Sequence, residues 1–167
     1  MRLSSNSGGE LMVRGWFTVR VELESGGGKV LNPRPGRIML VGPHHTFKDL
    51  AEEIDRAFVR WDLSHLHEFE FADGRRYGIP DDEYGEPAID YEQVRVGAVV
   101  RKSEKFTYVF DFGDNWRHSC QVTGSSLKPV EVAGIVPARP IPIWGWGWIP
   151  DQYGRRWDGD TGEDDDV

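Results

Sequence analysis

Three histidines and two aspartates stand in two short blocks of the sequence and could together bind a metal ion. The first block holds His65 and His67, and the second holds Asp111, Asp114 and His118. Two histidines at positions i and i+2 of a strand project from the same face, a common geometry for metal ligands. Ligands that mix nitrogen and oxygen suit Zn²⁺ or Mn²⁺, and an open coordination position would admit water. The pattern therefore defines a candidate functional cluster of these five residues, in which His65, His67, Asp114 and His118 are the candidate metal ligands.

A structural role explains the same residues and is the favoured interpretation, because a pair of histidines alone is a weakly specific pattern. Asp114 lies among turn residues and is suited to an Asx turn. Asp111 could pair with Arg117 across a hairpin, and His118 could lie edge-on among aromatic rings. The residues that would carry out catalysis stay unknown, and the chain contains no sequence motif of a nucleophilic or phosphate-binding enzyme.

The second block lies in the clearest structural pattern of the chain, residues 106–122. Aromatic residues alternate with other residues up to Phe112, turn residues follow, and alternation resumes at Trp116. This pattern predicts a β-hairpin. An odd loop would place Phe112 opposite Trp116, Asp111 opposite Arg117 and Phe110 opposite His118. A two-residue loop would exchange the faces, so the apolar match favours the odd loop.

The other segments that must position these residues alternate between strand and helix patterns. Residues 13–23 and 37–41 are predicted strands, and residues 65–71 form a third that ends at the turn Asp73-Gly74. Thr46 is the expected N-cap of an amphipathic helix whose core face holds Phe47, Leu50, Ala51, Ile54 and Phe58. The order of elements predicts an α+β fold with a mixed or antiparallel sheet, one helix packed on one face, and a β-grasp-like topology.

The composition of the chain limits the classes of partner that it can bind and the compartment in which it is expected. A net charge of −8 disfavours nucleic acid as a partner, since phosphate binding needs clustered lysines and arginines. No apolar run is long enough to cross a membrane. The single cysteine, Cys120, excludes an internal disulfide and indicates a cytoplasmic protein.

A tryptophan-rich stretch near the end of the chain is a candidate aromatic surface. Trp144, Trp146 and Trp148 alternate with glycines. Exposed rings of this kind can stack on nucleic-acid bases. Few basic residues accompany them, so we expect instead that they cover the apolar face of the sheet.

Two motifs resemble a known family. The run Phe110-Asp111-Phe112-Gly113-Asp114, followed by Trp116 and His118, resembles the Y-x-Y-D-F-G-D-x-W-x-H signature of plasmid pRi ORF-3-like proteins. The upstream block 61–69 is also similar to that family, and the tryptophan-rich ending resembles its insertion-element passenger branch. The resemblance extends over residues 14–124 and implies an uncharacterised protein of mobile elements, with resolvase or integrase labels in its branch. The chain lacks the nucleophile and basic residues that recombination requires.

These observations predict a disordered leader, 1–11, one domain, 12–150, and an acidic tail, 151–167, that we expect to be disordered. The expected function is an accessory binding or interaction module of a mobile element, with an unidentified protein partner. One alternative is a metal-dependent hydrolase or nuclease that uses the His and Asp cluster. The other is a nucleic-acid-binding accessory protein of a transposon.

Overall fold

The computed structural model describes residues 11–81, 85–155 and 159. The predicted leader lies outside these residues except for Leu11, and most of the predicted tail does so as well. Within the described residues, no helix is long and apolar enough to cross a membrane. The strands are β1 (Trp16–Gly26), β2 (Lys29–Val30), β3 (Gly36–Val41), β4 (His67–Glu70), β5 (Arg76–Gly78), β6 (Ile89–Asp90), β7 (Lys105–Phe110), β8 (Trp116–Leu127) and β9 (Ile141–Trp146). The helices are α2 (Phe47–Ala57), a single 3-10 turn (Val96–Ala98) and α3 (Pro129–Ala133).

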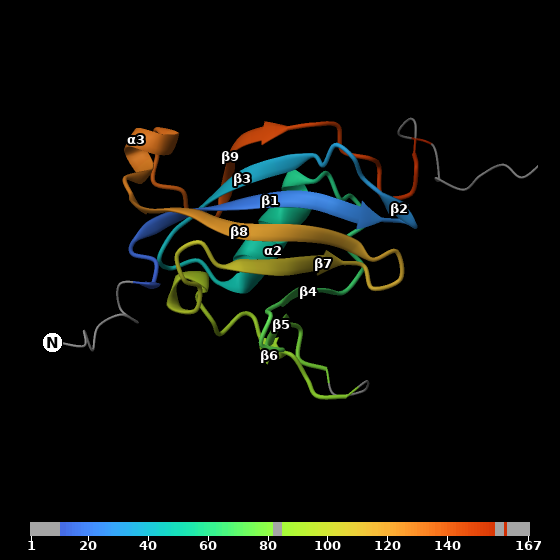
Figure 1. Cartoon of the computed structure of the whole chain (residues 1–167), viewed down its shortest axis with the longest axis horizontal. Coiled ribbons are helices and arrows are strands. Elements are labelled where there is room, and N and C mark those ends of the chain that lie inside the picture. The colour runs from blue at the N-terminus through green and yellow to red at the C-terminus, as the bar shows by residue number, and fades with distance from the viewer. Residues whose placement is uncertain (1–10, 82–84, 156–158, 160–167) are drawn as a thin grey trace, which may run out of the picture.

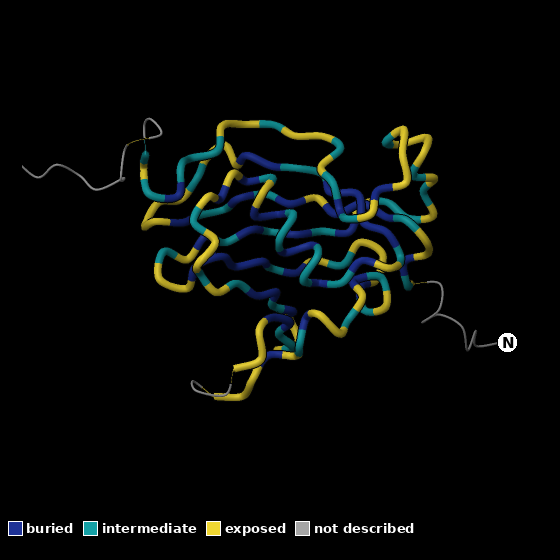
Figure 2. Tube along the Cα trace, turned by 180° about the vertical axis from the view of Figure 1, so that it is seen from behind, coloured by how far each residue is buried: buried dark blue, intermediate teal, exposed yellow. Residues whose placement is uncertain are grey.

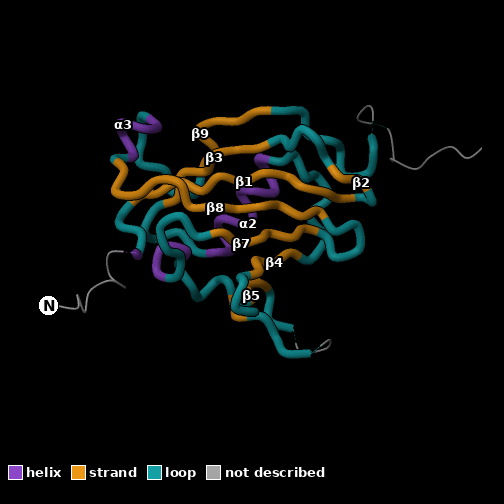
Figure 3. Tube along the Cα trace, viewed as in Figure 1, coloured by secondary structure: helices purple, strands orange, loops and turns teal. Residues whose placement is uncertain are grey.

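The described strands form one nine-stranded sheet with α2 packed across one face (Figures 1 and 3). The strand order is β6-β5-β4-β7-β8-β1-β3-β9, and β2 pairs with β1 outside this path. Only β5 and β6 pair in parallel; the other pairs are antiparallel. The predicted α+β class with one helix on one face of a mixed sheet is confirmed, whereas the β-grasp-like topology stays a prediction.

Helix α2 begins where the sequence predicts. The Thr46 hydroxyl accepts a hydrogen bond from the Asp49 amide at 3.2 Å, and the Asp49 carboxylate accepts one from the Thr46 amide at 3.0 Å. This capping box satisfies two amides that the helix itself cannot pair. The apolar residues that the periodicity places on one face are buried against the sheet. Helix α2 therefore packs on the sheet with a fixed rotation about its axis.

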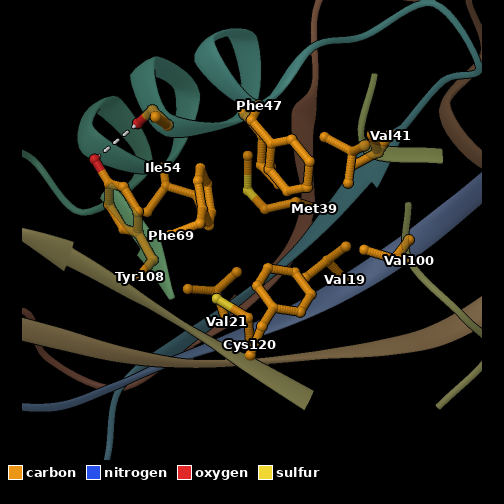
Figure 4. Close-up of a cluster of buried hydrophobic side chains, with 14 of the residues drawn as sticks. Val19, Val21, Met39, Val41, Phe47, Ile54, Phe69, Val100, Tyr108 and Cys120 are labelled. Carbon is orange, nitrogen blue, oxygen red and sulfur yellow. Dashed lines mark hydrogen bonds between the residues drawn. The ribbon is translucent and has the colours of Figure 1, made fainter. Parts of the chain in front are cut away.

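The core lies between α2 and the sheet (Figure 2 shows the buried strands from the helix side). Phe47 of α2 stacks on Tyr77 with ring centroids 4.4 Å apart. Figure 4 shows Phe47 and Ile54 pointing from the helix toward the strands, and Tyr108 reaching up to the helix. The Tyr108 hydroxyl is a polar group inside this core, and it donates to acceptors on α2, the Asp55 carboxylate and the Ala51 carbonyl.

The hairpin register differs from the prediction. The loop that joins β7 to β8 is odd, as expected, but it spans residues 111–115, so Phe110 faces Trp116 and Tyr108 faces His118. The predicted pairs of Phe112 with Trp116, Asp111 with Arg117 and Phe110 with His118 are wrong by two residues. The aromatic face still meets the Trp116 face, because a shift of two residues preserves the side on which each side chain lies.

The cause of the shift is Asp111. Its φ of 62° places it in the left-handed region, where a strand cannot continue. Its carboxylate accepts hydrogen bonds from the amides of Gly113 at 3.0 Å and Asp114 at 3.2 Å. Asp111, and not Asp114 as predicted, thus forms the Asx-type turn. Arg117 pairs instead with Glu70, across the sheet, at 3.2 Å.

The sheet face opposite α2 carries the tryptophans of β9. Trp144 is opposite Ile38 and is 70% exposed. Trp146 packs against Gly36, and the Arg20 guanidinium lies 4.3 Å from its ring centroid. Trp148 follows the strand and is exposed. Trp144 and Trp148 therefore do not cover an apolar sheet face as expected, because their rings are exposed to solvent, whereas Trp146 packs on the sheet.

Candidate functional site

A pocket of about 270 Å³ opens beside the C-terminal half of α2. Its walls come from the helix, from the segment 61–67 that leads into β4, and from the residues after β5 and β6. The side chains that line it are Glu52, Asp55, Arg56, Leu63, His65, His67, Ile79 and Tyr91. It therefore contains two of the five residues in the predicted cluster, His65 and His67.

Three residues that line the pocket, Asp55, His67 and Tyr91, form a hydrogen-bonded chain with the buried Tyr108 behind them. His67 Nδ1 lies 2.9 Å from Asp55 Oδ2, and His67 Nε2 lies 2.9 Å from the Tyr91 hydroxyl. The Tyr108 hydroxyl donates to Asp55 Oδ1 at 2.5 Å and also lies 2.8 Å from His67 Nδ1. This pattern assigns the imidazole proton to Nδ1, facing the carboxylate, and leaves Nε2 to accept from Tyr91.

Burial controls the charge of this network. It raises the pKa of the Asp55 carboxyl above its usual value, while the hydrogen bonds from His67 and Tyr108 and the positive charge of Arg60 act in the opposite direction. Burial also raises the pKa of Tyr91 and places that of Tyr108 well above its usual value. Both phenols are therefore protonated at neutral pH and act as donors.

A second network fixes the outer wall. The Tyr153 hydroxyl donates to Asp62 Oδ2 at 2.7 Å and lies 2.5 Å from His65 Nε2. The other imidazole nitrogen of His65 lies 3.4 Å from Asp111 Oδ2. Hydrogen bonds from Ser64 and then Tyr153 lower the pKa of the Asp62 carboxyl. His65 is thus held by groups from two distant parts of the chain.

The wall segment is anchored by residues 151–155, the described part of the predicted tail. The Gln152 side chain is buried, and its carbonyl oxygen accepts from the amides of Trp61 at 2.9 Å and Asp62 at 3.1 Å. Asp151 accepts from the Trp61 indole at 3.1 Å. These contacts hold segment 61–65 in place, and with it two of the residues that line the pocket.

The structure brings only part of the predicted cluster together. His65 and His67 line the pocket, and Asp111 lies behind His65. His118 is fully buried in the core, edge-on to Phe58 at 4.9 Å, as the structural alternative predicts. Asp114 lies at the hairpin end, where its carbonyl accepts from the Gly27 amide.

The four candidate metal ligands therefore do not gather in one place. Within residues 11–81 and 85–155, no group of three or more His, Cys, Asp or Glu side chains is placed to hold a metal ion. The structural role stays the favoured interpretation, and whether Zn²⁺ or Mn²⁺ binds is a question for titration.

Sequence reasoning missed the acidic partner of His67, although a signal for it exists. Asp55 lies four residues after Ala51 and three before Phe58, so it occupies the apolar stripe of the helix. A carboxylate in that position must find a buried partner. No local signal identifies Tyr153, which reaches His65 from the far end of the chain.

Fold and site together define an α+β protein with a pocket between the helix and the edge of the sheet. A sequence model of the plasmid pRiA4b ORF-3-like protein family matches residues 16–138. The chain belongs to this family, as the two motifs indicate.

Two individual proteins resemble the chain. Uncharacterized protein y4hQ of Sinorhizobium fredii (strain NBRC 101917 / NGR234) is 38% identical over 72 residues, which are 42% of this chain and 37% of that protein. The chain thus matches well under two thirds of that relative. The crystal structure of MM3350 from Methanosarcina mazei Go1, a protein of unknown function, has a TM-score of 0.59 and 23% identity, and covers 80% of this chain and 70% of that one. This likeness supports the fold.

Proposed function

We propose that the chain is a binding module whose pocket takes a basic side chain from a partner protein. The observation that carries the proposal is the composition of the pocket lining, which combines the α2 carboxylates Glu52 and Asp55 with the apolar Leu63 and Ile79. Arg56 also lines the pocket, and its guanidinium is paired with Glu53 at 3.0 Å. A lysine or arginine side chain has the matching form, a charged end on an apolar stem. The sequence predicts an accessory interaction role for a mobile-element protein, and the proposal names the kind of group that is bound.

The charge around the pocket favours a cation. The carboxylates on α2 and beside it outnumber the cations that pair with them. Glu52 lies 3.2 Å from Arg139 and 3.7 Å from Lys48, and Arg56 lies 3.0 Å from Glu53. Among the described residues, no lysine or arginine lies within ion-pairing distance of the buried Asp55 carboxylate, whose partner is the imidazole of His67 at 2.9 Å. An incoming ammonium group would therefore meet an excess of negative charge.

Exposed apolar side chains on the bordering segments favour a protein as the source of that cation. Leu63 and Ile79 line the pocket and are both more than a third exposed. Leu66 and Ile89, on the adjoining segments, are exposed as well. Apolar side chains concentrated around a polar pocket are typical of interaction sites.

An NMR titration tests whether the pocket binds. The probe is the peptide acetyl-Leu-Lys-Leu-amide, added to ¹⁵N-labelled full-length protein. We expect saturable amide shifts at Leu63, His65, His67 and Tyr91, and we expect Leu63→Ser to weaken them. Shifts concentrated on β9, or no saturable shift at millimolar peptide, would contradict the proposal.

One observation favours a second candidate function, an enzyme that transfers protons. The carboxylate of Asp55 orients His67, whose unprotonated Nε2 accepts from the Tyr91 hydroxyl and could act as a base toward a substrate hydroxyl in its place. In this alternative, a substrate that enters the pocket for hydrolysis would displace the Tyr91 hydroxyl from His67 Nε2. A screen of nitrophenyl esters and phosphodiesters would support it only if turnover disappears in His67→Gln while the melting temperature is retained.

A further inference from the structure

The guanidinium of Arg60 is buried without a hydrogen-bond partner. Arg60 follows α2, and its backbone amide donates to the carbonyl of Asp55 at 2.8 Å. The residue is only 4% exposed, and its guanidinium lies 4.4 Å from the Trp116 ring centroid. In the part of the chain that the structure describes, none of its three side-chain nitrogens has an acceptor.

Two neighbouring groups are buried and unpaired as well. Trp116 Nε1 has no acceptor among the described residues, although the indole lies directly against the guanidinium. His118, two residues further along the same face of β8, donates from Nδ1 to the Tyr108 carbonyl at 3.1 Å. Its Nε2 is therefore an acceptor, and it too has no partner. These three side chains place many N–H donors and one acceptor in one region of the core.

Such a set is unusual, because buried polar groups are nearly always hydrogen-bonded and a buried charge requires a counter-charge. The carboxylates that act on Arg60 are those of Asp55 and Asp151, and both are engaged elsewhere. Asp55 accepts from His67 and Tyr108, while Asp151 accepts from Trp61, Tyr153 and Arg155. Neither lies within ion-pairing distance of the guanidinium.

We infer that a small inorganic anion of the halide class binds at the Arg60 guanidinium and the Trp116 indole N–H. An anion accepts several N–H donors at once and supplies the missing negative charge, which a water molecule does not do. The nitrogens are closed to solvent, which favours a monatomic anion over a larger one. This site is separate from the pocket and does not depend on the proposed binding function.

Thermal unfolding of the full-length protein tests this inference. The melting temperature is measured in sodium chloride, sodium bromide and sodium gluconate at equal ionic strength. A ligand that binds only the native state raises the melting temperature, by about 2–4 °C at several times its Kd for a chain of this size. We expect this rise with chloride and bromide, and none with gluconate.

Two variants test whether the halide-specific rise in melting temperature depends on Arg60. Arg60→Met removes the charge and retains an apolar stem, so the halide-specific rise should disappear. Arg117→Met, a matched loss of a partly exposed arginine, should keep it. An equal response to all three salts, or a halide rise that persists in Arg60→Met, would overturn the inference.

Crystallography keeps the inference testable if Arg60→Met fails to fold. Bromide-soaked crystals of the unchanged protein should show an anomalous peak between the Arg60 guanidinium and Trp116 Nε1. Electron density for water alone at that position would overturn the inference.

Discussion

His67 Nδ1 lies 2.9 Å from Asp55 Oδ2, with the strand residue and the helix residue joined beneath the pocket. This contact joins β4 to α2, and both residues line the pocket. Because Tyr108 donates to the same carboxylate from β7, the network connects three elements through one buried group. It therefore serves the stability of the fold and the shape of the pocket at the same time.

Replacing Asp55 should reveal this coupling. Asp55→Ala leaves the His67 and Tyr108 donors buried without an acceptor, and we expect a loss of about 2–4 kcal/mol in the free energy of unfolding. In a double-mutant cycle of Asp55→Ala with His67→Ala, the interaction energy should reach at least about 0.5 kcal/mol. Urea denaturation measures both, with Glu131→Ala on α3 as the exposed control. Additive losses would show that the contact contributes little.

The fully buried His118 should make the protein sensitive to acid. Burial lowers its pKa from 6.5 to about 3, so between these values the unfolded chain binds more protons than the native state. The stabilisation is fully present above pH 6.5 and is lost as the pH falls toward 3, by up to about 1.4 kcal/mol per pH unit. Burial of Asp55, whose pKa is raised, acts in the opposite direction at the acidic end of this range.

The check is the pH dependence of urea unfolding in His118→Phe. This variant keeps the aromatic packing against Phe58 and removes the titrating group. Its stability should fall less steeply from pH 6.5 to 4.5 than that of the unchanged protein. Parallel curves for the two proteins would contradict the assignment.

The hairpin turn predicts a contrast between two aspartates. Asp111→Ala loses an acceptor for two amides and places a side chain without local hydrogen bonds at positive φ, so a loss of about 1–3 kcal/mol is expected. Asp111→Asn keeps an acceptor and tolerates that backbone, so its loss should be smaller. Asp114→Ala should change the stability by at most about 0.5 kcal/mol, since its contact to Gly27 uses the backbone. Denaturant midpoints at pH 7 for the three variants measure the contrast, and an Asp114 effect as large as that of Asp111 would contradict it.

These residues show where the sequence determines the structure and where it does not. The Thr46 cap, the helix stripe and the Asp73-Gly74 turn are set by contacts within a few residues, so local patterns predict them. Alternation predicts that the hairpin loop has an odd number of residues. The pairing register also depends on whether Asp111 belongs to the strand or to the loop. Hydrogen bonds within the folded turn, and the bond from the Asp111 amide to the Leu66 carbonyl, place Asp111 in the loop. A sequence pattern does not reveal these hydrogen bonds.

The site shows the same limit more strongly. His65 and His67 both line one pocket, although β4 begins at His67 and His65 therefore precedes the strand that the spacing assumed. The spacing also contains no information on the partners of the two histidines. Asp55 comes from the helix, Tyr91 from a loop, and Tyr153 from 88 positions further along the chain than His65. Contacts at such separations depend on the topology of the sheet, so the sequence pattern groups Asp114 and His118 with His65 and His67, which they do not contact in the structure.

Divalent metal should not stabilise the protein. Both ring nitrogens of His67 are engaged by Asp55 and Tyr91, and His65 is held by Tyr153 and lies beside Asp111, so a metal ion would have to displace these groups. We expect the melting temperature of chelator-treated protein to stay constant when Zn²⁺ or Mn²⁺ is added at neutral pH. A rise that is lost in the His65→Ala, His67→Ala double variant would restore the metal hypothesis.

The most direct test of the proposed function is the charge preference of the pocket. Calorimetry would compare the Kd of acetyl-Leu-Lys-Leu-amide with those of the peptides that carry glutamate or norleucine at the centre. The proposal predicts that the lysine peptide binds most tightly. Glu52→Gln should weaken it roughly two- to fivefold, because partly exposed charge pairs contribute up to about 1 kcal/mol, whereas Glu131→Gln should leave it unchanged. Equal affinity for the three peptides, or an equal effect of the two glutamine variants, would contradict the proposal that the pocket recognises a basic side chain.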